Sequence, residues 1–319
     1  MNGAKSPPPK FADRSLVASP ELTPSRLDKL LRALYPGASW NDVRRLVTTG
    51  KVSVGGTRVS DPGACIEAGA VIAIRMAAPR APSAPRLPDS ALLFTDAHVV
   101  VVAKPAGISS VPYDSTETGT LSELVRDALR RRPEPRRKGP EPELGIVHRL
   151  DKETSGVLVF ARTLAAKRAL KQQFRFHTVD RRYLAIAHGR VESGKIESRL
   201  VQDRGDGRRG STDNPTLGRE AVTHVRALEA LRGATLVECR LETGRTHQIR
   251  IHLSERGHPV VGDRVYCRGH DAPGIAAPRL MLHAFELGFL HPLSGDKLHF
   301  EVEIPADMEQ VLAGLRGPP

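Results

Sequence analysis

A proline-rich stretch divides this chain and limits what the whole of it can fold into. Residues 77 to 89 read AAPRAPSAPRLPD and contain four prolines. Proline fixes φ and lacks a backbone N–H, so such a segment is extended and semi-rigid and joins separately folded parts. The sequence therefore predicts a small domain over residues 23 to 76 and a larger one over residues 90 to 319. Residues 1 to 22, rich in Pro, Ser and Ala without apolar periodicity, are predicted to be a disordered tail.

The charge balance of the chain favours a polyanionic partner. The formal net charge is +12 and the pI is near 10.0, which suits nucleic acid better than a membrane surface. No apolar run approaches the roughly 20 residues of a membrane-spanning helix. Met1 to Lys10 lacks the apolar segment of a signal peptide. We therefore expect a cytoplasmic protein with no membrane partner.

Cysteine and histidine spacings give no sign of a metal site. Cys65, Cys239 and Cys267 are too widely spaced for a disulfide framework or a Cys-x-x-Cys pattern, and we expect them to be buried packing residues. Successive histidines between residues 247 and 258 are five and six positions apart. That spacing misses the i, i+4 arrangement that places two zinc ligands on one helix face. The sequence predicts neither metal nor cofactor.

The pattern of the small domain predicts an α/β unit. Leu27, Leu30, Leu31 and Leu34 share one face of a helix, for which Ser25 is a plausible N-cap. A second helix is expected over residues 41 to 49. Residues 52 to 59, with a Gly-Gly pair at their centre, predict a hairpin, and a strand over residues 71 to 74 closes the unit.

The larger domain alternates short apolar runs with helical patterns. Strands are expected over residues 99 to 103, 183 to 187, 235 to 241 and 299 to 304, and helices over 121 to 132 and 165 to 174. This order predicts an α+β domain built on a mixed or antiparallel sheet.

A dense polar segment, residues 148 to 156, lies between two apolar runs at 144 to 147 and 157 to 160. Both runs are expected to be short buried strands, which would place Asp151 on a turn held by the core. Loops positioned by a sheet often carry function. Alternatively, Asp151 or Thr154 satisfies local backbone donors in the turn. A second polar segment, residues 242 to 253, alternates like a strand at Ile249, Ile251 and Leu253, yet ends like a helix.

Several of these pieces occur in the order typical of a known family. The first domain resembles the S-four RNA-binding domain, and the second resembles the RluA-type pseudouridine synthases. The motifs of the second domain are Lys104 to Gly107, His148 to Gly156, Arg181 to Ala185, Thr243 to His252, Gly257 to Asp263 and Arg279 to Ala284. Two departures, Arg181 before the tyrosine and Val111 after the first motif, concern substrate contacts more than chemistry.

The resemblance implies a set of functional residues. Its catalytic aspartate corresponds to Asp151, its active-site tyrosine to Tyr183, and the arginine that pairs with the aspartate to Arg245. The substrate contacts that it implies in the catalytic domain are His148, Arg149, Thr154, Arg250 and Leu282, with Met281 as a further wall of the base site. The RNA-facing residues that it implies in the first domain are Arg26, Lys29, Arg44, Arg45 and Lys51.

The reaction that the resemblance implies is the isomerisation of uridine in ribosomal or transfer RNA, which needs no cofactor or metal. The sequence leaves the oligomeric state open, and a monomer is the default expectation. The reaction needs an ionised carboxylate in a pocket, and a positive charge within about 4 to 6 Å favours that state. Asp151 is then expected to attack the anomeric carbon or to assist departure of uracil. Two alternatives stay open: a catalytically silent RNA-binding protein, and a nucleoside or glycoside hydrolase that uses Asp151 and Glu153 as a carboxylate pair.

Overall fold

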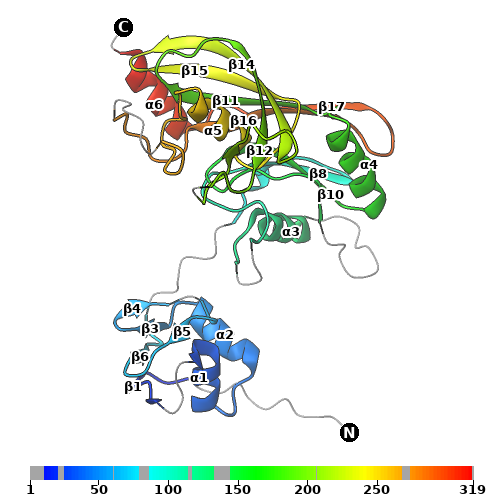
Figure 1. Ribbon diagram of the computed structural model, residues 1–319. Helices are drawn as coiled ribbons and strands as arrows, with labels where there is room; N and C mark the ends of the chain where they lie inside the picture. The colour runs from blue at the N-terminus through cyan, green and yellow to red at the C-terminus, as the bar shows by residue number, and fades with distance from the viewer. Residues whose placement is uncertain are drawn as a thin grey trace. The chain divides into compact units, whose positions relative to one another are not determined.

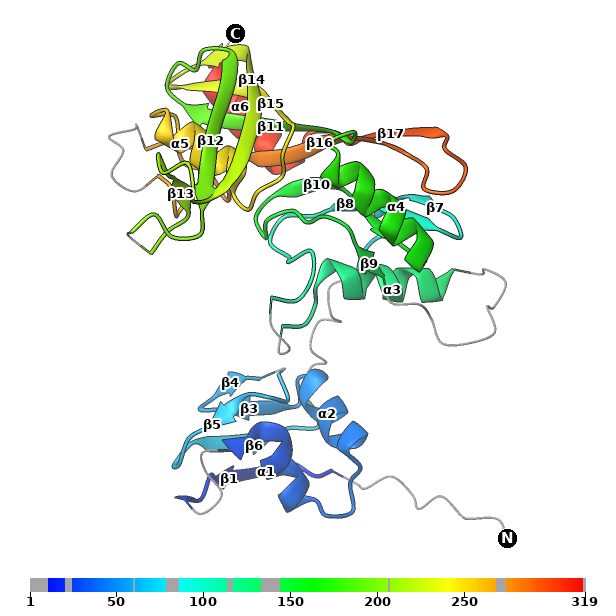
Figure 2. The same cartoon turned by 45° about the vertical axis from the view of Figure 1, so that its right-hand side comes forward.

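The chain folds into two compact units, Met1–Arg86 and Leu87–Pro319, which are described separately below. The computed structural model describes residues 11–20, 25–59, 61–78, 86–113, 117–132, 144–205, 207–267 and 274–317. Figures 1 and 2 show the elements of each unit. Most of the predicted proline-rich linker, residues 79–85, and the first ten residues of the predicted tail lie outside the described residues. No helix of the described residues is long and apolar enough to cross a membrane.

The N-terminal unit packs two helices against small antiparallel sheets. Its elements are β1 (Arg14–Val17), β2 (Ser25–Arg26), α1 (Leu27–Leu34), α2 (Trp40–Thr48), β3 (Val52–Val54), β4 (Thr57–Arg58), β5 (Cys65–Ile66) and β6 (Val71–Ile74). The strand order is β1-β6-β3-β4, and β2 pairs with β5. The predicted leucine face of α1 is confirmed, because Leu27, Leu30 and Leu31 are buried in one core with Ile72 of β6. The central glycines of the hairpin, Gly55 and Gly56, both have positive φ, as a tight hairpin turn requires.

Three expectations for this unit were wrong. Residues 14–17 of the predicted disordered tail form β1, which pairs with β6 in antiparallel register. Ser25 does not cap α1, because its backbone pairs with Ile66 and the N-cap position falls on Arg26. Cys65 is exposed. The first two errors have the same cause: the partner strand, β6 or β5, lies far along the chain and leaves no local signal.

The C-terminal unit is built on one 11-stranded sheet. Its elements are η2 (Asp89–Ala91), β7 (Leu92–Thr95), β8 (Val99–Lys104), α3 (Leu121–Arg131), β9 (Gly145–Ile146), β10 (Ser155–Ala161), α4 (Leu164–Arg175), β11 (Asp180–His188), β12 (Gly194–Val201), β13 (Gly210–Ser211), β14 (Arg219–Leu231), β15 (Ala234–Leu241), α5 (Gln248–Glu255), β16 (Leu282–Leu290), β17 (Lys297–Glu301) and α6 (Ala306–Arg316). The main strand order is β13-β12-β14-β15-β11-β16-β10-β8-β7, with β17 on β16 and β9 on β10.

The sheet is mixed, as the sequence predicted for an α+β domain. β10 runs parallel to β16, while β10 with β8, and β11 with β15 and β16, pair in antiparallel register. The two faces of the β8–β10 region are covered by different helices, as Figures 1 and 2 show. Val100 and Val102 pack with α3 in one cluster, whereas Val99 and Val101 pack with α4 in another. This alternation is the period of two that a strand buried on both faces imposes.

Other predictions for this unit were refined by the structure. Residues 248–255 form a helix, which settles the strand-or-helix ambiguity. The alternation of Ile249, Ile251 and Leu253 arose because α5 is buried on two sides, with Ile249 and Leu253 in one core cluster and Ile251 in another. Leu87, which the sequence assigned to the linker, is buried in the core of this unit. The strand expected over residues 299 to 304 ends instead at Glu301.

Candidate active site

Asp151 lies where the short strand β9 gives way to β10, on the predicted turn. The turn closes with the Thr154 amide donating to the Asp151 carbonyl at 3.1 Å. The Ser110 hydroxyl donates to the Leu150 carbonyl at 2.8 Å and accepts from the Leu150 amide at 3.0 Å. The buried ammonium of Lys104 donates to the carbonyls of Pro105, Lys152 and Thr154 at 3.0, 2.9 and 2.7 Å. The backbone on both sides of Asp151 is therefore fixed.

The turn lies against β16 at a point where only glycine fits. Gly156 has a φ of +124°, and a Cβ added there would lie 2.1 Å from the Ala284 carbonyl oxygen. Gly156 is in register with Ala284 of β16, which is also in register with Tyr183 of β11. This close approach brings the Asp151 turn next to the strand that carries Tyr183.

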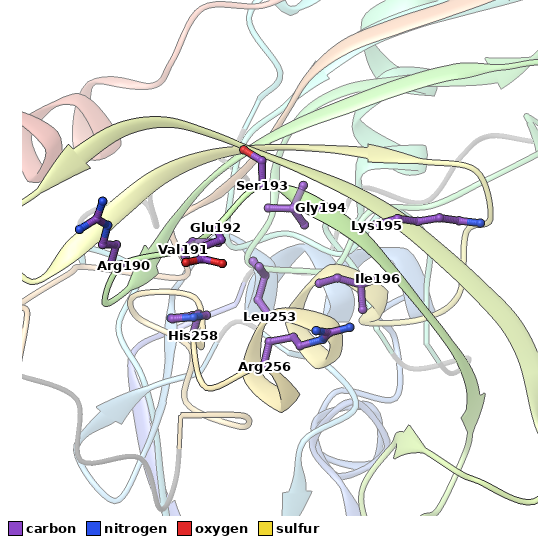
Figure 3. Close-up of a pocket in the computed structure, with 11 residues that line it drawn as sticks. Arg190, Val191, Glu192, Ser193, Gly194, Lys195, Ile196, Leu253, Arg256 and His258 are labelled. Carbon is purple, nitrogen blue, oxygen red and sulfur yellow. The ribbon is translucent and has the colours of Figure 1, made fainter.

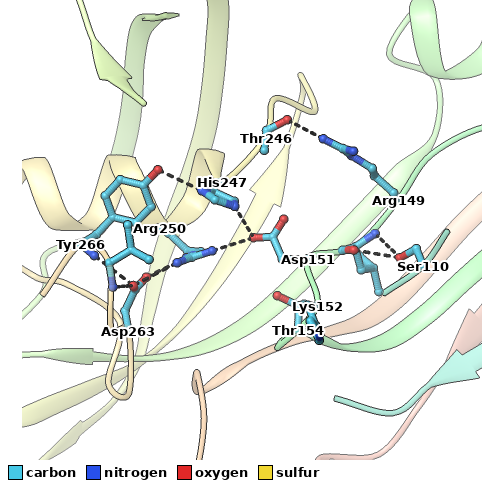
Figure 4. Close-up of polar contacts among 12 residues, drawn as sticks. Ser110, Arg149, Asp151, Lys152, Thr154, Thr246, His247, Arg250, Asp263 and Tyr266 are labelled. Carbon is cyan, nitrogen blue, oxygen red and sulfur yellow. Dashed lines mark hydrogen bonds and ion pairs between the residues drawn. The ribbon is translucent and has the colours of Figure 1, made fainter. Parts of the chain in front are cut away.

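Arg250, and not Arg245, pairs with Asp151. The Arg250 Nη1 donates to the Asp151 Oδ2 at 3.2 Å, as Figure 4 shows. Arg245 instead directs its Nε to the Glu220 carbonyl oxygen at 2.8 Å. The expectation that Arg245 is the partner of the aspartate was therefore wrong, although Arg245 lines the same pocket as Asp151. Arg250 comes from α5, whose side chains at this point face the turn.

A buried carboxylate holds the Arg250 guanidinium from its other side. Asp263 accepts from the Arg250 Nε at 2.7 Å and from Nη2 at 3.0 Å. Burial alone would lower the pKa of Arg250, but these hydrogen bonds and the charges of Asp263 and Asp151 raise it. The pKa of Asp263 is lowered against the effect of burial, because Arg250 and the amides of Val265 and Tyr266 bind its carboxylate. The Arg250 fork is fixed before any substrate arrives.

His247 completes the polar ring around Asp151. Its Nε2 lies 3.9 Å from the Asp151 Oδ2, and its Nδ1 is 2.9 Å from the Tyr266 hydroxyl (Figure 4). Burial lowers the pKa of His247, although the Asp151 charge acts in the opposite direction. His247 has a φ of +59°, rare for a residue other than glycine. Such backbone strain clusters at functional sites, where the surrounding structure enforces it.

The Asp151 pocket is a small cavity of about 60 Å³. Tyr183, Thr154 and Leu282 line it together with Asp151, Arg245 and Arg250. Burial, reinforced by the Asp151 charge and opposed by Arg181, raises the pKa of the Tyr183 phenol to about 12. Tyr183 therefore carries its proton at neutral pH. The Thr154 hydroxyl is buried and has no hydrogen-bond partner, which is uncommon for a buried polar atom.

Known proteins share both the sequence and the fold of this chain. A family model for RNA pseudouridylate synthases matches residues 98–255, and one for the S4 domain matches residues 25–72. The ribosomal large subunit pseudouridine synthase D of Zymomonas mobilis is 37% identical over 296 residues, which cover 89% of this chain and 92% of that protein. The chain belongs to the RNA pseudouridylate synthase family.

One further relative agrees with this membership, and a solved structure shares the fold. An uncharacterized RNA pseudouridine synthase of Bacillus subtilis, YlyB, is 36% identical over 306 residues, which cover 94% of this chain and 97% of that protein. The human RNA pseudouridylate synthase domain containing 4 has the same fold, with a TM-score of 0.57 at 23% identity, covering 71% of this chain and 93% of that one. The resemblance drawn from the motifs of both domains is thereby confirmed.

Several residues that the resemblance singled out lie away from the pocket of this RNA pseudouridylate synthase. The His148 ring stacks on Phe174 of α4, with ring centroids 4.6 Å apart, and its Nε2 accepts from the Val159 amide. Burial and the charge of Arg181 lower the pKa of His148 to about 3, so this ring is neutral, and it does not line the Asp151 pocket. Met281 is fully buried in the core and does not line the pocket. Glu153 is likewise absent from the lining of this pocket, although it lines a neighbouring cleft together with Asp151.

Arg149 lies at the rim of the Asp151 pocket. Its Nη2 donates to the Thr246 hydroxyl at 3.1 Å, which joins the aspartate turn to the loop before α5 (Figure 4). Arg149 lines the Asp151 pocket and also the two clefts beside it.

The basic residues of the S4 domain have varied surroundings. Arg26 and Arg44 lie 3.0 and 3.9 Å from the buried carboxylate of Asp28. Arg45 pairs with Asp42 at 3.2 Å, and Lys29 is exposed. Lys51 directs its ammonium to the carbonyls of Met76 and Ala78. The position of Lys51 argues against a main role in RNA contact, because two of its three donors bind carbonyls within the domain.

The described residues contain one group with metal-ligand geometry, outside the pocket. Ligand atoms of Glu286, His299 and Glu301 lie within 4.8 Å of one another on β16 and β17. Glu286 is also 3.4 Å from Arg182, and that positive charge disfavours a cation.

Sequence reasoning did not assign a role to Lys104, Ser110, His247, Asp263 or Tyr266. Lys104, His247 and Asp263 belong to motifs that carried the resemblance, so the motifs were the available signal. Ser110 and Tyr266 act through contacts with residues 40 and 19 positions away. No local pattern marks such partners.

Proposed function

We propose that this RNA pseudouridylate synthase converts specific uridines of ribosomal RNA to pseudouridine, with Asp151 as the catalytic carboxylate. The observation that carries the proposal is the ion pair between Asp151 and Arg250 inside a pocket that also contains Tyr183. Ribosomal RNA is proposed over transfer RNA because relatives that align over nearly their whole length are named ribosomal large subunit pseudouridine synthases.

The chemistry needs a carboxylate and no external reactant. The bond between N1 of uracil and the anomeric carbon breaks, the base turns, and C5 forms the new bond to the same carbon. The hydrogen at C5 leaves as a proton and N1 gains a proton, so the reaction has no redox change and consumes no water. We propose that the enzyme acts as a monomer in the cytoplasm without metal or cofactor.

Arg250 takes the role that the resemblance gave to Arg245. An opposite charge this close favours the ionised form of a carboxyl group, and the Arg250 Nη1 lies 3.2 Å from the Asp151 Oδ2. Because Asp263 fixes the guanidinium by two hydrogen bonds, the pair does not need to reorganise during the reaction. Asp151 then either attacks the anomeric carbon or stabilises positive charge on it as uracil departs.

The pocket walls position the uracil ring. Tyr183 offers an aromatic face and a protonated hydroxyl, Leu282 offers an apolar wall, and the Thr154 hydroxyl has its hydrogen-bonding capacity free. Access requires that the target nucleotide leave its stack, at a cost of a few kcal/mol that is smallest at unpaired sites. Contacts of the basic surface with phosphates offset this cost. The proposed RNA surface of the S4 domain consists of Arg26, Lys29, Arg44 and Arg45.

Mapping of pseudouridine in ribosomal and transfer RNA, from cells with and without the gene, tests the proposal. Loss of specific pseudouridines from ribosomal RNA is expected, and complementation with Asp151→Asn should not restore them. Asp151→Asn keeps the size of the side chain, so retained conversion would refute the role of the carboxylate. Release of free uracil by the purified enzyme would indicate hydrolysis instead of isomerisation.

A further inference from the structure

A cleft of about 540 Å³ adjoins the Asp151 pocket and is lined by arginines. Arg149, Arg209, Arg219 and Arg245 contribute to its walls, and none of the described residues that line it is acidic. We call it the four-arginine cleft. It shares Arg149 and Arg245 with the Asp151 pocket, so the two cavities are adjacent. A ligand that enters the pocket from a longer polymer has neighbouring units within reach of the cleft.

The charges of this cleft are not neutralised by the protein. Within the described part of the chain, none of the four guanidinium groups forms a salt bridge with a carboxylate. Arg245 and Arg149 bind the Glu220 carbonyl and the Thr246 hydroxyl, both uncharged groups. Burial and the nearby charge of Arg219 lower the pKa of Arg245, although the charge of Glu220 acts in the opposite direction. Four like charges gathered in one cleft repel one another, and an anion relieves that repulsion.

The arginines stand on backbone that is held in place. The Ser211 amide, two residues beyond Arg209, donates to the Glu255 carboxylate of α5 at 2.8 Å. Arg199 donates to the carbonyls of Leu217 and Gly218, next to Arg219, at 2.8 and 3.0 Å. The backbone that carries Arg209 and Arg219 is therefore held in place, which reduces the backbone entropy lost on binding.

We propose that the four-arginine cleft binds the RNA backbone beside the target uridine, with phosphates contacting Arg209 and Arg219. This inference rests on the proposed function. A guanidinium donates two parallel hydrogen bonds to a phosphate. Among the residues that the structure describes, no aromatic side chain lines the cleft, so these residues offer no stacking surface for a base. The cleft therefore contacts the RNA backbone and does not read the base sequence.

A second basic cavity of the same unit provides the matched control. Arg190, Lys195, Arg256 and His258 line a cavity of about 360 Å³ near the C-terminal end of α5 (Figure 3). It contains Glu192 and shares no residue with the Asp151 pocket or the four-arginine cleft. Replacing Arg190 and Arg256 therefore changes the net charge as much as replacing Arg209 and Arg219 does, but away from the proposed path of the RNA.

The experiment compares two double variants, Arg209→Gln/Arg219→Gln and Arg190→Gln/Arg256→Gln, with the unaltered full chain. Binding of a fluorescein-labelled single-stranded RNA of about 12 nucleotides is measured by anisotropy over a series of salt concentrations. KM and kcat are measured with a transcript of large-subunit ribosomal RNA. For Arg209→Gln/Arg219→Gln we expect the salt slope to fall by about 1.4, since each phosphate contact with a single strand contributes about 0.7. We expect KM to rise by about tenfold or more and to account for most of the loss.

The outcomes separate this inference from its alternatives. If both double variants change the salt slope and KM equally, the RNA is held by general electrostatic attraction, and the proposal that the cleft is a binding site is wrong. An unchanged slope, or a fall in kcat without a change in KM, would also overturn it. If Arg209→Gln/Arg219→Gln does not fold, Arg209→Lys/Arg219→Lys keeps the charge and should retain most of the slope. If the unaltered protein forms no pseudouridine but the slope still differs between the two double variants, the proposed function fails and the anion cleft does not.

Discussion

The Asp151 pocket and the four-arginine cleft share Arg149 and Arg245, yet their charged groups have opposite surroundings. In the pocket, Arg250 is held between Asp151 and Asp263, and Lys104 beneath the turn is held by three carbonyls. In the cleft, the guanidinium groups form no salt bridge with a carboxylate of the described residues. Burial explains the difference: the side chains of Arg250 and Asp263 are 10% and 0% exposed. A charge removed from water needs a partner within the protein, whereas an exposed charge remains free for a ligand.

The largest expected effect tests this contrast at two arginines of one segment. Arg250→Met leaves the Asp263 carboxylate buried without its partner, so we expect the free energy of unfolding to fall by roughly 3 to 5 kcal/mol. Conversion of uridine should fall at least about a hundredfold. Arg245→Met should cost less than about 1 kcal/mol of stability. Urea unfolding and single-turnover assays measure both quantities. Equal loss of stability in the two variants would remove the distinction between pocket and cleft.

The next largest effect on stability is expected from alanine substitutions at two glycines where the backbone is closely packed. In Gly156→Ala the added Cβ would lie 2.1 Å from the Ala284 carbonyl oxygen, so the aspartate turn must move. We expect a loss of about 3 kcal/mol or more in stability and loss of activity. In Gly218→Ala, at the cleft, the nearest backbone atom is 2.9 Å away, which should cost about 1 to 2 kcal/mol. Thermal unfolding of the two variants measures which loss of stability is larger. A larger loss at Gly218 would contradict a rigid pocket beside a more tolerant cleft.

The pH dependence of stability reports on the buried cation beneath the turn. Burial, opposed by the charges of Asp151 and Glu153, lowers the pKa of Lys104 to about 7. A lysine of the unfolded chain has a pKa near 10.4. Between about pH 7 and pH 10.4, Lys104 is therefore protonated in the unfolded chain but has released its proton in the folded chain. The free energy of unfolding should therefore rise with pH above about 7, by up to about 1.4 kcal/mol per pH unit. Lys104→Met should lack this rise, whereas Arg219→Met should keep it. Parallel curves for wild type and Lys104→Met from about pH 7 to 9 would mean that Lys104 stays charged.

The smallest effect on stability, with a clear effect on activity, is expected at Thr154. Its buried hydroxyl has no partner, so Thr154→Val should leave the free energy of unfolding unchanged or raise it by about 1 kcal/mol. Loss of a substrate hydrogen bond should lower kcat/KM by about tenfold. Thr235 is the control, because its buried hydroxyl accepts from Val191 and donates to Gly189. Thr235→Val should lose about 1 to 3 kcal/mol of stability and keep its activity. Unchanged kcat/KM in Thr154→Val would show that substrate does not use this hydroxyl.

Local patterns predicted much of the fold. The leucine period of α1, the positive-φ glycines of the β3–β4 hairpin and the apolar runs of β8, β10 and β15 all appear where the sequence indicated them. These features depend on side-chain periods and turn residues within about ten positions of one another. The tail strand β1 was missed, because its pairing with β6 joins Arg14 to Ile74 and leaves no mark on either segment alone.

The sequence by itself determined the family, the order of the two domains and the position of Asp151 on a turn between strands. Only the tertiary structure decided which arginine faces that aspartate. Arg245 and Arg250 lie in one motif, and their order gives no reason to prefer either. The left-handed backbone of His247 turns the chain as α5 begins, so Arg250 reaches a carboxylate 99 positions away while Arg245 points into the cleft. The direction in which an arginine side chain points depends on the packing of all the segments between it and its partner. No local sequence pattern encodes that packing.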